Sequence, residues 1–330
     1  MIDTGTTAVQ SSILLNIINV VAILLFVVGS AAFTTWVERR MLGIWQDRYG
    51  PNRVGPFGLL QVVADMIKLL WKEDWIPPFS DKFVFVVAPT IAMFVVVAAF
   101  AVIPVAPGIG VVDLNIGLLF FLAMTSLGVY AVMFGAYASD NKYALLGGLR
   151  AAAQMVSYEV FMGLSLMGVV MLTGTFNLRE IVYAQNDGWF FIPQFIGMCI
   201  FFIAGIAESH RTPFDLPEAE HELTAGFHTE YSGMKFGMFF IGEYVSVILT
   251  SAMMTVLFFG GWLGPTWSFF AYIPPIFWFL GKTAILVLLM ILIRGALPRP
   301  RYDQLMAFGW KAMLPLAMVN LIITGLIVLI

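Results

Sequence analysis

The chain has 330 residues, of which 60% are hydrophobic and only 11% are charged, and its mean hydropathy is +0.92. Soluble domains carry about 25% charged residues, so the composition excludes a soluble protein and predicts an all-α polytopic membrane protein, a single domain over residues 1–330. The net charge of −3 gives no indication of nucleic-acid binding, and we expect no nucleic-acid partner.

Eight segments are long and apolar enough to span a membrane, which takes about 20 predominantly apolar residues. The predicted spans are Ser12–Trp36, Phe83–Ile103, Leu114–Tyr137, Ala151–Thr173, Phe190–Ala207, Phe236–Phe259, Pro275–Ile293 and Leu305–Leu329. We group them as a first span (12–36), a five-helix core (83–259) and two last spans (275–329). The uncharged run from Thr4 to Val37 is longer than the ~7–15 residues of a signal-peptide core, so we expect the first span to be retained.

The distribution of lysine and arginine predicts the orientation of these spans. Fourteen of these residues lie in the odd-numbered loops, and Arg179 alone lies in an even-numbered loop. Because cytoplasmic loops carry the excess of positive charge, we expect the odd-numbered loops in the cytoplasm and both termini outside.

The first loop contains an amphipathic pattern within residues 56–73. Between Leu59 and Lys72 the polar residues recur at steps of four, three and four, at Gln61, Asp65, Lys68 and Lys72. This spacing places them on one stripe of a helix whose remaining surface is apolar. We predict an interfacial helix, which either shapes a lateral opening at the membrane surface or serves as a simple surface anchor.

The loop between the fifth and sixth predicted spans, residues 208–235, concentrates acidic side chains. From Glu208 to Glu230 it holds six carboxylates, all three histidines of the chain and one arginine, Arg211. Crowded carboxylates have raised pKa values and can exchange protons. A solvated acidic loop is the alternative, but the prolines and aromatic residues in this loop favour a packed segment.

Four charged residues fall within the predicted spans: Glu159, Glu243, Lys282 and Lys311. Such charges are costly in lipid and mark functional sites by default. The two glutamates lie nine and eight residues beyond cytoplasmic charges, which is about 12–13 Å at 1.5 Å per residue, so they share a depth near the bilayer centre. They are candidates for proton carriers, and a buried ion pair with Lys282 or Lys311 is the structural alternative.

The chain lacks residues that handle electrons. No predicted span contains histidine, Cys199 is the only cysteine, and no phosphate-binding or dinucleotide-binding glycine motif is found. Haem and iron–sulfur ligation need such residues, so we expect no bound metal or cofactor, and any electrons must come from partner subunits.

Four segments together resemble one family. They are ERRMLGIWQDRYGPNRVGPFGLLQ from Glu38, RAAAQMVSYEV from Arg150, ESHRTPFDLPEAEHEL with TEYSGMKF from Glu208, and LPRPRYDQLM from Leu297. The chain resembles the quinone-site membrane subunits of respiratory complex I, the proton-pumping NADH:quinone oxidoreductase. This family comprises mitochondrial subunit 1 and its bacterial equivalents.

The resemblance implies roles for individual residues. The entrance of a quinone chamber would be lined or supported by Glu38, Arg39, Arg48, Asp65, Arg294 and Arg299. An acidic path coupling quinone reduction to proton pumping would be formed by Glu159, Glu208, Asp215, Glu218, Glu220, Glu222, Glu230 and Glu243. Completion of headgroup reduction is implied for a neighbouring hydrophilic subunit, so the isolated chain would be inactive.

The resemblance also implies the surroundings of the chain. Quinone would be the substrate, and FMN and iron–sulfur clusters would lie in partner subunits. Partners would be hydrophilic-arm subunits docked on the cytoplasmic loops, small membrane subunits, antiporter-like subunits and lipid. The location would be a bacterial inner membrane, or the mitochondrial inner membrane if the chain is organellar.

Two other functions fit the same sequence less well. One is an ion-translocating or anchoring subunit of a related membrane-bound hydrogenase. The other is a stand-alone secondary transporter. Many such transporters are built from inverted repeats, and the absence of an evident inverted repeat in this sequence counts against this function.

Overall fold

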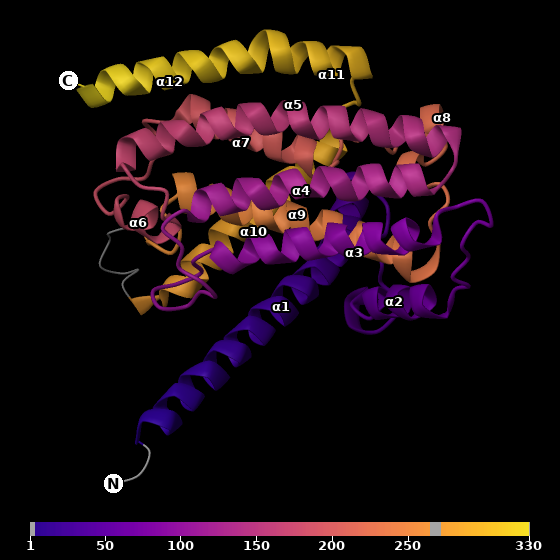
Figure 1. Cartoon of the computed structure of the whole chain (residues 1–330), viewed down its shortest axis with the longest axis horizontal. Helices are drawn as coiled ribbons and strands as arrows, with labels where there is room; N and C mark the ends of the chain where they lie inside the picture. The colour runs from indigo at the N-terminus through magenta and orange to yellow at the C-terminus, as the bar shows by residue number, and fades with distance from the viewer. Residues whose placement is uncertain (1–3, 265–271, 330) are drawn as a thin grey trace.

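Every regular element of the described chain, residues 4–264 and 272–329 of a computed structural model, is helical (Figure 1). The longer helices are α1 (Thr4–Trp45), α3 (Lys82–Ala99), α4 (Gly117–Ala138), α5 (Lys142–Thr173), α7 (Phe195–Glu208), α9 (Gly233–Phe258), α10 (Pro275–Ala296) and α12 (Leu314–Leu329). The short helices are α2 (Gln61–Trp71), α6 (Leu178–Tyr183), α8 (Glu220–Leu223) and α11 (Tyr302–Phe308). A π-helical turn, Gly309–Met313, joins α11 to α12.

Seven described helices are long and apolar enough to cross a membrane, with α11 to α12 counted as one helix. The all-helical membrane fold is therefore confirmed. The one predicted span outside these seven is the fifth, which corresponds to α7; this helix starts at Phe195, five residues later than expected, and has 14 residues. Its length is about 21 Å at 1.5 Å per residue, shorter than a hydrocarbon core of ~30 Å.

Helix boundaries differ from hydropathy windows because charges end a window but do not end a helix. α1 continues past Trp36 to Trp45 and α5 begins at Lys142, before the predicted start at Ala151. Side-chain caps set some boundaries instead. Asn141 accepts a hydrogen bond from the Tyr143 backbone N–H at 2.9 Å and so begins α5, as expected for an N-cap residue.

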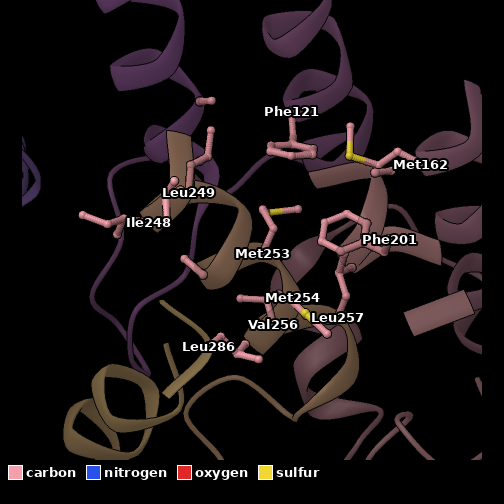
Figure 2. Close-up of a cluster of buried hydrophobic side chains, with 14 of the residues drawn as sticks. Phe121, Met162, Phe201, Ile248, Leu249, Met253, Met254, Val256, Leu257 and Leu286 are labelled. Carbon is pink, nitrogen blue, oxygen red and sulfur yellow. The ribbon is translucent and has the colours of Figure 1, made fainter. Parts of the chain in front are cut away.

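The central helix of the fold is α9. In its most apolar stretch 78% of the residues are buried within the chain, against 17% for α1. Figure 2 shows Met253 and Leu257 of α9 among side chains from other helices, including Phe121 of α4, Met162 of α5 and Phe201 of α7. The packed core therefore fixes α9, and with it Glu243 and Tyr244, against the rest of the bundle.

The helices α1 and α2 lie at the periphery of the bundle (Figure 1). α1 crosses the bundle obliquely and extends away from it, and α2 lies near the end of the bundle where α1 enters (Figure 1). Both α1 and α2 contact α9, and α1 also contacts α10. Figure 1 places the start of α1 and the end of α12 toward one end of the bundle, with α6, and α2 and α8 toward the other end.

Candidate functional site

A cavity of about 540 Å³ lies where the end of α1 meets α9 and α10. It is lined by Glu38, Arg39, Leu42, Arg48, Tyr49, Gly50, Pro51, Phe240, Tyr244 and Arg294. The wall combines arginine and carboxylate groups with aromatic and aliphatic side chains. Such a mixture suits a ligand with a polar head and an apolar body.

Two glycines shape this wall. The turn after α1 folds back so closely that a Cβ atom on Gly43 would lie 2.9 Å from the Arg48 backbone oxygen. A Cβ on Gly50 would lie 2.9 Å from the Arg40 Cα. Because only glycine permits this approach, the turn can place Arg48 and Tyr49 against the cavity.

A smaller cavity of about 40 Å³ lies between α1 and α2 and shares Arg39, Phe240 and Tyr244 with the large one. Asp65 of α2 lines it and pairs with Arg39 at 2.5 Å between carboxylate and guanidinium atoms. This ion pair ties α2 to α1. The predicted polar stripe of α2 is therefore partly exposed and partly, through Asp65, a component of the cavity wall.

Arg211 connects the large cavity to the acids behind it. Its Nη1 lies 3.7 Å from Glu38 Oε2, and its Nη2 lies 3.7 Å from Glu243 Oε2. The guanidinium also lies over the Tyr244 ring, 3.9 Å from the centroid. Arg211 and Glu38 are buried, and Arg294 donates a further hydrogen bond to Glu38. A buried arginine needs partners of this kind.

Glu218 and Asp215 extend this cluster. The carboxyl groups of Glu218 and Glu243 lie close together, with one oxygen of each within 4.8 Å of the other. Burial raises the pKa of Glu218 well above its usual range, and the neighbouring acids Glu243 and Asp215 raise it further. Burial also raises the pKa of Asp215, although Arg299, which donates to it at 2.7 Å, opposes the change. Raised pKa values of this kind favour the protonated form of these two carboxyl groups.

Glu208 and Glu159 form a second acidic pair deeper along the bundle. Glu208 at the end of α7 lies near Thr125 of α4 and near Glu159 of α5. Glu159 accepts a hydrogen bond from Ser126 of α4. Both hydroxyls therefore come from one turn of α4, which positions the two carboxyl groups.

A cavity of about 70 Å³ separates this pair from the first cluster. Its lining includes Thr125, Glu208, His210, Glu243 and Ser246. A water molecule needs roughly 10–15 Å³ of such volume and polar partners, so the cavity has room for water between Glu208 and Glu243. Burial lowers the pKa of His210 to about 4, so its imidazole is neutral at neutral pH.

The expected acids do not all gather at this site. Glu222 pairs with Arg150 at 2.6 Å, where both side chains are about one-third exposed, and Glu230 accepts from Asn141 at 2.7 Å. These two carboxylates are held at the edge of the loop. The side chain of Glu220 lies outside the described part of the structure.

Within the described residues, neither Lys282 nor Lys311 forms an ion pair with Glu159 or Glu243. Lys282 donates instead to the backbone oxygens of Phe259, Gly261 and Leu263 at 2.6, 3.1 and 2.6 Å, and Lys311 is exposed. Glu243 pairs with Arg211. The sequence signal for Arg211 as the partner of Glu243 is that Arg211 is the one arginine among the six carboxylates of the loop.

The site also contains Tyr244 and Ser126, which were not among the residues predicted from the sequence. Tyr244 stacks on Arg211 and lines the large cavity, whereas Ser126 bonds Glu159. Tyr244 directly follows Glu243 in sequence, but nothing in the sequence distinguishes it from other aromatic residues of the span. Ser126 likewise has no local signal, because its role depends on the packing of α4 against α5.

Comparisons with known proteins give matches over almost the whole chain. Residues 18–325 match the NADH dehydrogenase family. The H subunit of the NADH-quinone oxidoreductase of Methylococcus capsulatus is 64% identical over 306 residues, which is 93% of this chain and 95% of that protein.

Proposed function

Because the chain belongs to the NADH dehydrogenase family of complex I membrane subunits, we propose that its large cavity is the entrance of a quinone chamber. We propose further that its buried acids form a path that couples quinone reduction to proton translocation. The observation that carries both proposals is the bridge that Arg211 makes between Glu38 in the cavity wall and Glu243 behind it.

The chemistry of the cavity wall supports a quinone. Arg39, Arg48 and Arg294 offer hydrogen-bond donors for the carbonyl oxygens of a headgroup, while Leu42 and Phe240 offer apolar contacts. The neighbouring small cavity between α1 and α2 gives the apolar tail a route toward lipid. Electrons reach the quinone from FMN and iron–sulfur clusters in partner subunits, and a neighbouring hydrophilic subunit completes headgroup reduction.

The acid path is proposed to run inward from Asp215 and Glu218 to Glu243. From there it crosses the cavity of about 70 Å³ to Glu208 and Glu159. Along this path Glu218 and Glu243 approach within 4.8 Å, water has room between Glu243 and Glu208, and Glu159 lies near Glu208. We assign Glu220, Glu222 and Glu230 to the outer end of the path, where the last two have exposed or half-buried partners.

The proposed topology has eight spans, with α7 as the short fifth span and both termini outside. The concentration of Lys and Arg in the odd-numbered loops supports it, as does the location of the start of α1 and the end of α12 toward one end of the bundle. α2 is proposed to lie at the membrane surface, because its outward side chains Val63, Ile67 and Leu70 are more than half exposed in the chain alone.

The proposed partners are hydrophilic-arm subunits on the cytoplasmic loops, with small and antiporter-like subunits on the membrane faces. We place the complex in a bacterial inner membrane. A membrane-bound hydrogenase subunit is the second candidate, and the 64% identity to a quinone oxidoreductase subunit favours the first. Flavin and quinone in the purified complex would support the first candidate, whereas a nickel–iron centre would support the second.

A photoreactive quinone analogue tests the chamber in the assembled complex. We expect it to label peptides from the turn Gln46–Pro51 or from α9 near Phe240, and excess native quinone should suppress the labelling. Labelling confined to surfaces remote from these segments would contradict the proposal.

A further inference from the structure

Glu218 and His228 of the acidic loop meet Glu243 of α9 at one point. Each offers one ligand atom, and these three atoms all lie within 4.8 Å of one another. They come from three separate segments: the residues before α8, the short helical turn Gly226–His228, and α9. The Nδ1 atom of His228 lies 3.7 Å from Oε1 of Glu218, and the His228 side chain is only 6% exposed.

This group contains a buried polar atom that lacks a hydrogen-bond partner. Within the described residues, Oε1 of Glu218 is buried and has no hydrogen-bond partner. Leaving such an atom unpaired costs roughly 1–3 kcal/mol, so unpaired buried atoms indicate an additional ligand, water or ion. Here Oε1 of Glu218 faces the imidazole across the space between them.

We propose that Glu218, His228 and Glu243 form a binding site for a divalent cation of the zinc class. One imidazole nitrogen and two carboxylate oxygens are a ligand set that zinc accepts, with water in the fourth position. Tetrahedral zinc with bonds of ~2.0–2.2 Å places its ligands about 3.4 Å apart. The 3.7 Å between His228 and Glu218 is close to this value, and Glu243 needs a modest side-chain shift.

The surrounding charges fit one cation. Arg211 approaches Oε2 of Glu243 at 3.7 Å, which leaves the other oxygen of that carboxylate for the ion, and Asp215 is already paired with Arg299 at 2.7 Å. Magnesium and calcium prefer oxygen ligands alone, so the imidazole selects against them. Binding requires both carboxylates ionised, and a proton held between the two carboxyl groups is therefore released to water.

The site is accessible from the side of Glu218, whose side chain is 19% exposed. An ion bound there occupies Glu218 and Glu243, two members of the proposed proton path. Zinc is thus expected to inhibit quinone reduction, and this consequence rests on the proposed function. Zinc binding at the site does not depend on the proposed function.

Zinc content of the purified complex tests the site directly. The complex is equilibrated with zinc chloride, freed of unbound metal by gel filtration and analysed by mass spectrometry. Wild type is expected to retain one more zinc per complex than His228→Gln. His210→Gln is the matched control, because His210 is a buried histidine of the same loop whose ring nitrogens also lack partners, and it should retain the wild-type count.

A second variant keeps the test decisive if His228→Gln does not assemble. His228→Cys preserves a zinc ligand, so it should retain the ion and add a zinc–sulfur distance of about 2.3 Å to the X-ray absorption difference spectrum. Equal zinc in wild type and His228→Gln, or no added sulfur in His228→Cys, would overturn the site. Zinc that binds as expected without slowing turnover would contradict the proton path and leave the site standing.

Discussion

Replacement of Arg211 by methionine removes the charge that Glu38 and Glu243 share. Both carboxylates lie 3.7 Å from guanidinium nitrogens, and Arg211 is only 9% exposed. Loss of one partner from a buried ion pair costs about 3–5 kcal/mol. Because Arg294 still neutralises Glu38, we take the lower value of about 3 kcal/mol, which corresponds to roughly a 150-fold change in an equilibrium constant.

The expected result is depletion of the assembled complex together with reduced turnover of the remainder. The assay is the amount of complex on native gels and the NADH:quinone activity per assembled complex. Arg211→Lys keeps the charge, but a lysine ammonium cannot reach both carboxylates and stack on Tyr244 as a planar guanidinium does. We therefore expect this variant to recover assembly more than activity.

Arg150→Met is the matched control. Arg150 pairs with Glu222 where both side chains are about one-third exposed, and such pairs contribute only about 0–1 kcal/mol. It should assemble nearly normally. If Arg211→Met assembled and turned over as well as Arg150→Met, the pairing of Arg211 with Glu38 and Glu243 would contribute to neither assembly nor activity.

Arg294→Ala is expected to raise the apparent KM for quinone several-fold while ferricyanide reduction by the hydrophilic arm stays unchanged; an equal loss of both activities would indicate misassembly. Glu159→Gln, and more weakly Glu220→Gln, should lower quinone reduction and proton pumping together, with the corresponding aspartate variants milder. Normal pumping in vesicles of fully assembled glutamine variants would exclude an obligatory relay. His210 is buried and its pKa falls from 6.5 to about 4, so its neutral form stabilises the fold above pH 6.5, and this contribution is lost as the pH falls from 6.5 toward 4. A difference of 2.5 pKa units corresponds to about 3 kcal/mol, and thermal inactivation of His210→Gln should therefore depend less on pH over this interval than that of wild type. Parallel pH profiles of the two proteins would refute this assignment.

The sequence by itself determined the helical membrane fold and most helix positions. Hydropathy is a property of short stretches, so it can be evaluated without knowledge of packing. The crowding of carboxylates between two apolar segments likewise indicated where the buried acids lie. The one span placed poorly, α7, is short and begins next to Pro193 and Gln194, where an apolar window does not coincide with a helix.

Only the tertiary structure decided which of these charges act together. Glu38, Arg211, Glu243 and Arg294 come from four distant segments, and their pairing depends on how α1, α9 and α10 pack around the loop before α8. The same packing excludes Lys282 from Glu243 by directing it to backbone carbonyls. Ion pairing follows distance in space, and distance between remote segments is set by the whole core, which no local window contains.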